Sequence, residues 1–258
     1  LILSGHSSSV NVDSSVSVTN LQIDLRSSHN LTLDSDITVT GDLTINEVGA
    51  INGGAIVVGG NVISNDAGVA DASTATIRLS GAGDQVLSGG GVEGDLPNLE
   101  IVKSGGSVTI TDAITVDGDL AVSGVDVSGT LVLSGGSATL DVDSNCTLGD
   151  LVINLNSGCS LTLNGDVNIS GDLTLTQPQD FSGGTFVVSG SVLGVDAPIV
   201  NTGSGKIFYS GSQDDTVVGT DADDTLRGGE GDDTLDGGAG SDTADYADDT
   251  VIEAGTLQ

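Results

Sequence analysis

The chain has 258 residues, of which 37 are acidic and five are lysine or arginine, so its formal net charge at pH 7 is −32. This balance excludes nucleic acid and anionic membranes as obvious partners, because phosphate contacts need clustered basic side chains. It favours surroundings rich in divalent cations, which offset the repulsion among carboxylates. Aromatic residues make up only 2% of the chain, whereas glycine occurs 40 times and proline three times, a mixture typical of many short strands joined by tight turns.

Residues 1–210 carry a long repeat, which is clearest in the segments 20–45, 98–122 and 150–175. Each segment has an apolar triplet, a small polar turn, a second apolar triplet and a Gly-Asp-Leu corner. The corners are Gly41-Asp42-Leu43, Gly118-Asp119-Leu120 and Gly171-Asp172-Leu173. Apolar and polar residues alternate within the triplets, as in Leu31-Thr32-Leu33, which indicates half-buried strands.

These short strands predict a coiled architecture. Strands of roughly three to five residues recur about every ten residues, and no stretch has apolar residues at helical spacing over three turns. A flat pair of such strands would be unstable alone, but stacked coils give every strand hydrogen bonds above and below. We therefore predict an all-β fold, a parallel β-solenoid with coils of roughly 20 residues over residues 1–208. A β-sandwich is the main alternative, because the repeats do not fix whether neighbouring strands run parallel.

Features that would support catalysis are weak. His6 and His29 lie in serine-rich segments, and we interpret both as exposed turn residues. No Ser-His-Asp arrangement or Gly-x-Ser-x-Gly motif stands out. Cys146 and Cys159 are close in the sequence. Either they form a disulfide, or they are two unpaired small residues of the solenoid wall. Neither has histidines or further cysteines nearby in the sequence, as a zinc site would need. We predict that the chain is not an enzyme.

A shorter repeat, with a period of nine, occupies 211–245. An Asp-Thr pair returns at every ninth position and is followed each time by an apolar residue. The four triplets are Asp215-Thr216-Val217, Asp224-Thr225-Leu226, Asp233-Thr234-Leu235 and Asp242-Thr243-Ala244. Such a unit divides into a longer turn and a short strand, and two units would make one coil. Units two apart would then stack, so that Asp215 shares a row with Asp233, and Asp224 shares one with Asp242.

This pattern resembles the RTX nonapeptide G-G-x-G-x-D-x-U-x, in which U is a large apolar residue. Residues 228–236 fit every position, and residues 237–245 depart only at Ala244. The resemblance implies a right-handed β-roll over 209–258 with its end cap, binding Ca²⁺ between stacked turns, since calcium takes six to eight oxygen ligands. The residues that we expect to bind calcium are Asp215, Asp224, Asp233 and Asp242, the carbonyls around Gly229, Gly231, Gly238 and Gly240, and Asp221, where the second unit lacks glycine.

Composition and resemblance together predict a structural role outside the cell. The longer repeat resembles the Thr/Ser/Gly-rich solenoid arrays of bacterial surface-layer and adhesin proteins. We expect a secreted or cell-surface protein, exported by type I secretion, that self-associates or binds other surface components in a calcium-dependent way. No apolar run approaches the roughly 18 residues of a membrane helix, and the start at Leu1 rather than methionine predicts a processed or excised piece. The alternative is an accessory module of a secreted polysaccharide-active enzyme, a lyase or an epimerase.

Overall fold

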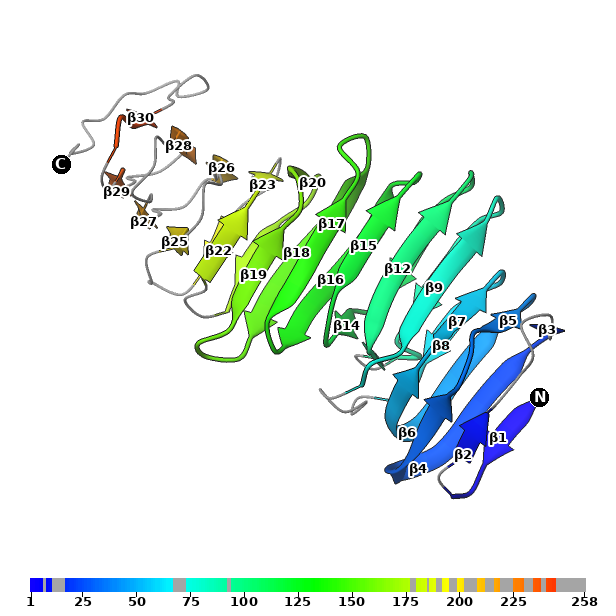
Figure 1. The fold of residues 1–258 in the computed structure, drawn as a ribbon. Coiled ribbons are helices and arrows are strands. Elements are labelled where there is room, and N and C mark those ends of the chain that lie inside the picture. Colours follow the sequence, from blue (N-terminus) through cyan, green and yellow to red (C-terminus); the bar gives the residue numbers. More distant parts are fainter. Residues whose placement is uncertain are drawn as a thin grey trace. The chain divides into compact units, whose positions relative to one another are not determined.

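The computed structural model describes residues 1–6, 8–10, 17–66, 73–91, 94–176, 180–184, 186–188, 192–194, 199–201, 208–211, 216–218, 225–229, 234–237 and 240–244. Among these residues every helix or strand assigned is a β-strand (Figure 1). The strand pairings within the two compact units of the chain, Leu1–Gly135 and Gly136–Gln258, are all parallel. The predicted all-β parallel solenoid is confirmed, and the β-sandwich alternative is wrong.

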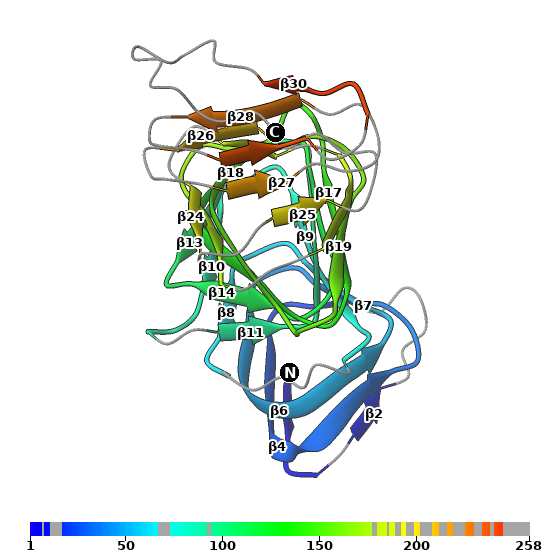
Figure 2. The same cartoon turned by 90° about the vertical axis from the view of Figure 1, so that its left-hand side faces the viewer.

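The first unit is a wound stack of short parallel strands. Its strands are β1 (Ile2–Ser4), β2 (Ser8–Val10), β3 (Ser17–Val18), β4 (Leu21–Leu33), β5 (Ile37–Val39), β6 (Leu43–Gly53), β7 (Ala55–Val58), β8 (Val62–Ser64), β9 (Thr76–Gly81), β10 (Gln85–Ser88), β11 (Gly94–Leu96), β12 (Asn98–Lys103), β13 (Val108–Thr111), β14 (Ile114–Val116), β15 (Leu120–Ser123) and β16 (Val127–Gly135). One wall consists of β3, β5, β7, β9, β12 and β15 in that order. Figure 2 shows β9 on one side of this unit and β10 and β13 on the other.

The register of this wall gives the length of a coil. The partners in successive strands are Ile37, Ile56, Ile77, Leu99 and Leu120, so one coil takes roughly 20 residues of chain. All five side chains are at most 1% exposed, and they form one continuous apolar column inside the coils. The predicted coil length is confirmed, and the column explains why β-branched residues and leucine alternate with polar residues.

The second unit repeats this arrangement with coils that shorten toward its end. Its strands are β17 (Ala138–Val142), β18 (Thr147–Leu155), β19 (Ser160–Leu163), β20 (Val167–Ile169), β21 (Leu173–Leu175), β22 (Asp180–Gly183), β23 (Phe186–Val188), β24 (Val192–Gly194), β25 (Ile199–Asn201), β26 (Phe208–Gly211), β27 (Thr216–Val218), β28 (Thr225–Gly229), β29 (Thr234–Asp236) and β30 (Thr243–Ala244). One wall consists of β17, β19, β22, β25, β27 and β29. The coil is longest where Ala138 pairs with Leu161. It is shorter, and constant in length, where Ile199 pairs with Val217 and Val217 pairs with Leu235.

The Gly-Asp-Leu corners are held by an Asn or Asp side chain of the preceding coil. The Oδ1 of this side chain accepts a hydrogen bond from the backbone N–H of the corner aspartate. The next residue in the preceding coil, a leucine each time, donates its backbone N–H to the carbonyl of the same corner aspartate. The Oδ1 pairs are Asn20 with Asp42 (2.9 Å), Asn98 with Asp119 (2.9 Å) and Asp150 with Asp172 (3.0 Å). Glycine precedes each corner aspartate because an added Cβ there would collide with the same Oδ1.

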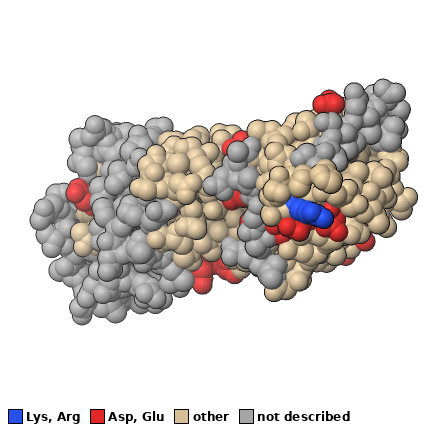
Figure 3. Space-filling view, turned by 90° about the horizontal axis from the view of Figure 1, so that it is seen from below, with Lys and Arg blue, Asp and Glu red and all other residues tan. Residues whose placement is uncertain are grey.

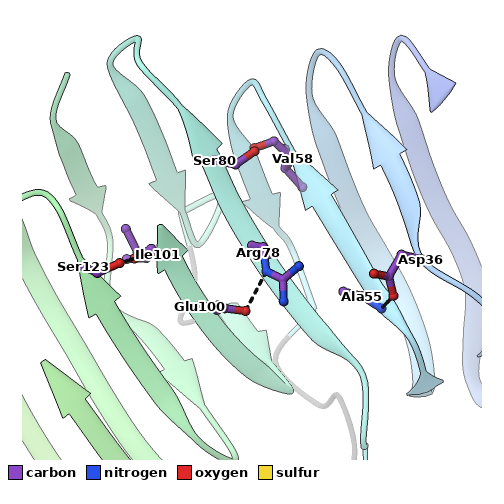
Figure 4. Close-up of polar contacts among 8 residues, drawn as sticks. All are labelled: Asp36, Ala55, Val58, Arg78, Ser80, Glu100, Ile101 and Ser123. Atoms are coloured by element: carbon purple, nitrogen blue, oxygen red, sulfur yellow. Dashed lines mark hydrogen bonds and ion pairs between the residues drawn. The ribbon is translucent and has the colours of Figure 1, made fainter. Parts of the chain in front are cut away.

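Serine and threonine hydroxyls also link each coil to the one before it. Ser80 Oγ donates to the Val58 carbonyl at 3.5 Å, and Ser123 Oγ donates to the Ile101 carbonyl at 3.4 Å (Figure 4). Thr40, Ser104, Ser128, Ser170 and Thr176 make the same contact. The abundance of serine and threonine therefore has a structural use: it satisfies wall carbonyls and keeps the outer face polar.

One buried lysine lies inside the first unit. Lys103 is 6% exposed, and its Nζ donates to the Gly83 carbonyl at 2.7 Å and to Gln85 Oε1 at 2.6 Å. Gln85 Nε2 donates in turn to the Val58 carbonyl at 3.2 Å. Burial lowers the pKa of Lys103 below its ordinary value, and the charge of Asp84 opposes that shift. The buried ammonium thus joins three coils through hydrogen bonds.

Asn98 offers a test of the corner contacts, because its Nδ2 donates to the Ala75 carbonyl at 3.0 Å while its Oδ1 accepts from Asp119. We expect Asn98→Ala to lower the free energy of unfolding by about 1–3 kcal/mol, since both hydrogen bonds are lost. Asn98→Asp keeps an acceptor for Asp119, so its stability should fall between those of the alanine variant and the native chain. Denaturant midpoints measured in calcium check this, and equal midpoints for all three proteins would contradict it.

Lys103 predicts a pH dependence with a definite sign. A lowered pKa means that the unfolded chain binds this proton more tightly than the folded chain does. The free energy of unfolding therefore rises with pH up to the ordinary lysine pKa, and this contribution is lost as pH falls through the folded-state pKa. Relative to Lys103→Met, the free energy of unfolding of the native chain should increase over the alkaline range that leads up to the ordinary lysine pKa of 10.5. Denaturation of both proteins across that range measures it; a constant difference would show that Lys103 titrates normally.

Candidate metal centre

The nonapeptide strands stack at the spacing that two units per coil require. In the second unit, β27 pairs with β29 so that Thr216 faces Thr234, and β28 pairs with β30 so that Thr225 faces Thr243. The partners in both pairs are separated by two nonapeptides. Each of these threonines directly follows an aspartate predicted to bind calcium. The predicted stacking of alternate units is therefore confirmed for the four strands that begin after those aspartates.

The apolar position of the repeat points inward where its burial is described. Val217 faces Leu235, and Leu226 faces Ala244, in the same two strand pairs. Leu235 is 6% exposed, whereas its neighbours Thr234 and Asp236 are exposed. Ala244 is half-buried, which follows from its small side chain and short strand. The alternation puts the apolar residue inside the coil and leaves the turns to carry the oxygen ligands.

The turn between β29 and β30 brings a carboxylate over a glycine. Asp242 is half-buried, and its carboxyl group occupies the space that a side chain on Gly237 would need. Gly240 has φ +128°, a conformation that residues with a Cβ rarely adopt. The repeat glycines are thus needed here for two reasons, close approach at position 237 and backbone conformation at position 240.

The structure describes three of the predicted calcium ligands. Gly229 ends β28 and pairs with Gly211 of β26 in the neighbouring coil, and Gly240 and Asp242 belong to the turn between β29 and β30. Within the described ranges, no three His, Cys, Asp or Glu side chains gather as a metal site, so the individual ligand assignments stay predictions. The other predicted ligands lie outside the described residues: Asp215, Asp221, Asp224, Asp233, Gly231 and Gly238.

The turn chemistry fits a hard cation. A glycine-rich turn offers backbone carbonyls, and one half-buried carboxylate adds negative charge at its end. Calcium prefers six to eight such oxygens at about 2.3–2.6 Å and tolerates irregular geometry. Zinc favours histidine and cysteine ligands, which the nonapeptide segment does not contain. Asp242 and the carbonyls of its turn are the described groups suited to hold calcium.

Comparison with known families agrees with this geometry. Residues 209–244 match the model of the RTX calcium-binding nonapeptide repeat, in four copies. The chain carries RTX repeats. These RTX repeats bind calcium, and they occupy the C-terminal strands of the second unit, from β26 onward. No curated protein and no solved structure matches the chain. The boundary predicted between residues 208 and 209 stays a prediction.

Histidine and cysteine positions add two findings. The rings of His6 and His29 contact each other, with centroids 5.2 Å apart. Sequence reasoning interpreted both as exposed turn residues; His6 is exposed, but His29 lies in β4 and is half-buried. Cys146 is buried, Cys159 is half-buried, and both are free thiols. In this structure, therefore, Cys146 and Cys159 do not form a disulfide.

Among the residues that the structure describes, none forms a helix with the length and hydrophobicity needed to cross a bilayer.

Asp242 and Asp236 form a matched pair for testing the calcium turn. Asp236 is exposed at the end of β29, shortly before Asp242 in the chain, and either change to asparagine removes one negative charge. We expect Asp242→Asn to raise the calcium concentration for half-maximal folding by about tenfold, or 1.4 kcal/mol, because a ligand is weakened. Asp236→Asn should change it much less. Circular dichroism against free calcium measures both; equal shifts would mean that net charge alone governs binding.

Proposed function

We propose that this protein is an extracellular structural component, part of a surface layer, adhesin or fibre, whose folding and assembly depend on calcium bound by its RTX repeats. In this role the solenoid is the spacer or display surface. The RTX coils are a folding switch that closes when the chain meets extracellular calcium. We further propose that the chain itself is not an enzyme.

The observation that carries the proposal is the shared wall of the second unit. β19, β22, β25, β27 and β29 are consecutive parallel neighbours, so the RTX strands extend the same sheet as the solenoid strands. Order in the RTX coils therefore provides hydrogen-bonding partners for β25 and, through it, for β22. Repeat architectures gain stability from such nearest-neighbour contacts. Calcium bound at the end of the unit would in this way stabilise strands that bind no calcium themselves.

Charge supports the same conclusion. Parallel strands lie about 4.8 Å apart, and two carboxylates at about 4 Å repel by roughly 1 kcal/mol in water and 4 kcal/mol near a protein surface. The RTX segment repeats an aspartate at every ninth position and has one arginine, Arg227, among them, and its described strands pair at a spacing of two repeats. Without a divalent cation the segment should repel itself open. Binding free energy then becomes folding free energy, which suits a protein that folds when it meets extracellular calcium. RTX repeats are typical of type I secreted proteins.

The described surface offers little for a catalytic role. Figure 3 shows acidic side chains across one face, with a basic spot among them. On the outer wall, Arg78 Nε donates to Glu100 Oε2 at 2.6 Å (Figure 4), and Lys103 is buried. A lyase or epimerase acting on acidic sugars would need basic side chains gathered in a groove. The accessory-module alternative remains the second candidate, because RTX tracts also accompany such enzymes.

Calcium should control both order and assembly of the purified full chain. In chelator we expect the RTX segment to lose its β-structure and the circular dichroism signal that reports it. When millimolar calcium is added, we expect the β-structure to return and ordered assemblies to form. Circular dichroism and electron microscopy of the same samples measure the two responses. The Asp242→Asn variant should need more calcium for both. Folded, assembled protein in chelator would contradict the proposal.

Turnover assays distinguish the accessory-module alternative from the structural role. The chain is incubated with alginate and pectin in calcium, and unsaturated products or epimerised residues are measured. We expect none. Turnover by the purified chain would replace the structural proposal with an enzymatic one, whereas binding to these polymers without turnover would favour the accessory-module role.

A further inference from the structure

Coil stacking brings the two histidines of the chain together at one corner of the first unit. His6 lies between β1 and β2, and His29 lies in β4, the strand that pairs with both of them in the next coil. Their ring centroids are 5.2 Å apart and their planes are at 88°. Since the chain has only these two histidines, their contact is a feature of the fold rather than of a histidine-rich sequence.

The contact depends on a bulge in β4. At the start of β4, Asp24 pairs with Ser4, and after the bulge Leu31 pairs with Ser8. β4 therefore holds three extra residues between these two pairs, and they interrupt its register with β6 between Asp24 and Asn30. Arg26 has φ 75° within this bulge, a left-handed conformation that costs a non-glycine residue on the order of 1–3 kcal/mol and often marks functional sites.

Hydrogen bonds fix the bulge and the ring of His29. The Ser27 N–H donates to Glu47 Oε1 at 2.8 Å, which ties the bulge to the following coil. Ser28 Oγ lies 3.1 Å from His29 Nδ1. With its proton on Nδ1, the ring donates to this hydroxyl and presents the Nε2 lone pair. A hydrogen bond to the second ring nitrogen is the usual means of orienting a metal-binding histidine.

The spacing of the rings suits one shared metal ion. With metal–nitrogen distances of about 2.0–2.1 Å and a tetrahedral angle, two imidazoles on one ion have centroids roughly 5 Å apart, close to the separation observed. We propose that His6 and His29 form a two-histidine site for a first-row transition metal ion such as Zn²⁺, which links neighbouring coils of the solenoid. Within the described residues no third His, Cys, Asp or Glu joins these two as a metal-binding group.

This site differs from the RTX sites in ligand chemistry and in place. Imidazole nitrogen favours zinc, nickel and copper, whereas calcium takes oxygen. The histidines belong to the first unit, and the RTX repeats belong to the second. Zinc binding at the histidines is therefore expected to persist when calcium saturates the repeats, and the proposal stands independently of the proposed function.

The test is zinc titration of the full chain in excess calcium, in competition with a chromophoric chelator. We expect one Zn²⁺ that binds more tightly than the background of carboxylates. His6→Asn and His29→Asn should each weaken it by at least the roughly 10–100-fold that loss of an outer-shell partner causes. The double variant should lose little more, because either change removes the pair. Asp34→Asn, which removes an exposed carboxylate after β4, should bind zinc as the native chain does.

Two outcomes would overturn the proposal. One is native-like zinc affinity in both histidine variants, which would assign the binding to carboxylates. The other comes from the native protein and does not depend on how the variants fold: zinc-edge X-ray absorption should show two imidazole ligands, and a spectrum with oxygen ligands alone would rule the site out. Circular dichroism in calcium confirms that each variant keeps its β-structure.

Discussion

Parallel stacking of coils is the constraint on which the rest of this structure depends. Each residue lies above its counterpart of the neighbouring coil at the strand spacing of about 4.8 Å, so whatever the sequence repeats is also stacked. Repeated isoleucine, valine and leucine become an apolar column, as with Ile37, Ile56 and Ile77. Repeated carboxylates become rows of like charge, and with a net charge of −32 this chain must provide partners for them.

The two parts of the repeat provide those partners differently. At the Gly-Asp-Leu corners an Asp or Asn side chain accepts a hydrogen bond from a backbone N–H of the next coil, as Asp150 does from Asp172. In the RTX segment the turns are richer in glycine and each coil is two nonapeptides long. There the carboxylate of Asp242 comes against backbone, and the repeat family supplies calcium as the partner. The protein thus combines corners that are held by its own hydrogen bonds with RTX repeats that bind calcium.

The more regular a repeat is, the more of its strand pairing could be predicted from the sequence. The nonapeptide period is strict, so the pairing of Thr216 with Thr234 followed directly from counting. The longer repeat varies in length from coil to coil, so the sequence predicted coils but not which residues face one another. The role of Asn98 at its corner was missed because its partner belongs to the next coil. The contact of His6 with His29 was missed because it needs the bulge in β4.

Hydrogen exchange on the full chain, with and without calcium, measures how far calcium orders the RTX strands and the wall beside them. We propose that the aspartates repeated near the C-terminus are tolerated only when an ion neutralises them, and that order in their coils supports the neighbouring strands. We therefore expect the amides of β27 to β30 to be protected in calcium and to exchange freely in chelator. β22 and β25 should lose part of their protection, whereas β9 and β12 of the first unit should be unchanged. Equal protection of β27 to β30 in both conditions would show that these coils are ordered without calcium.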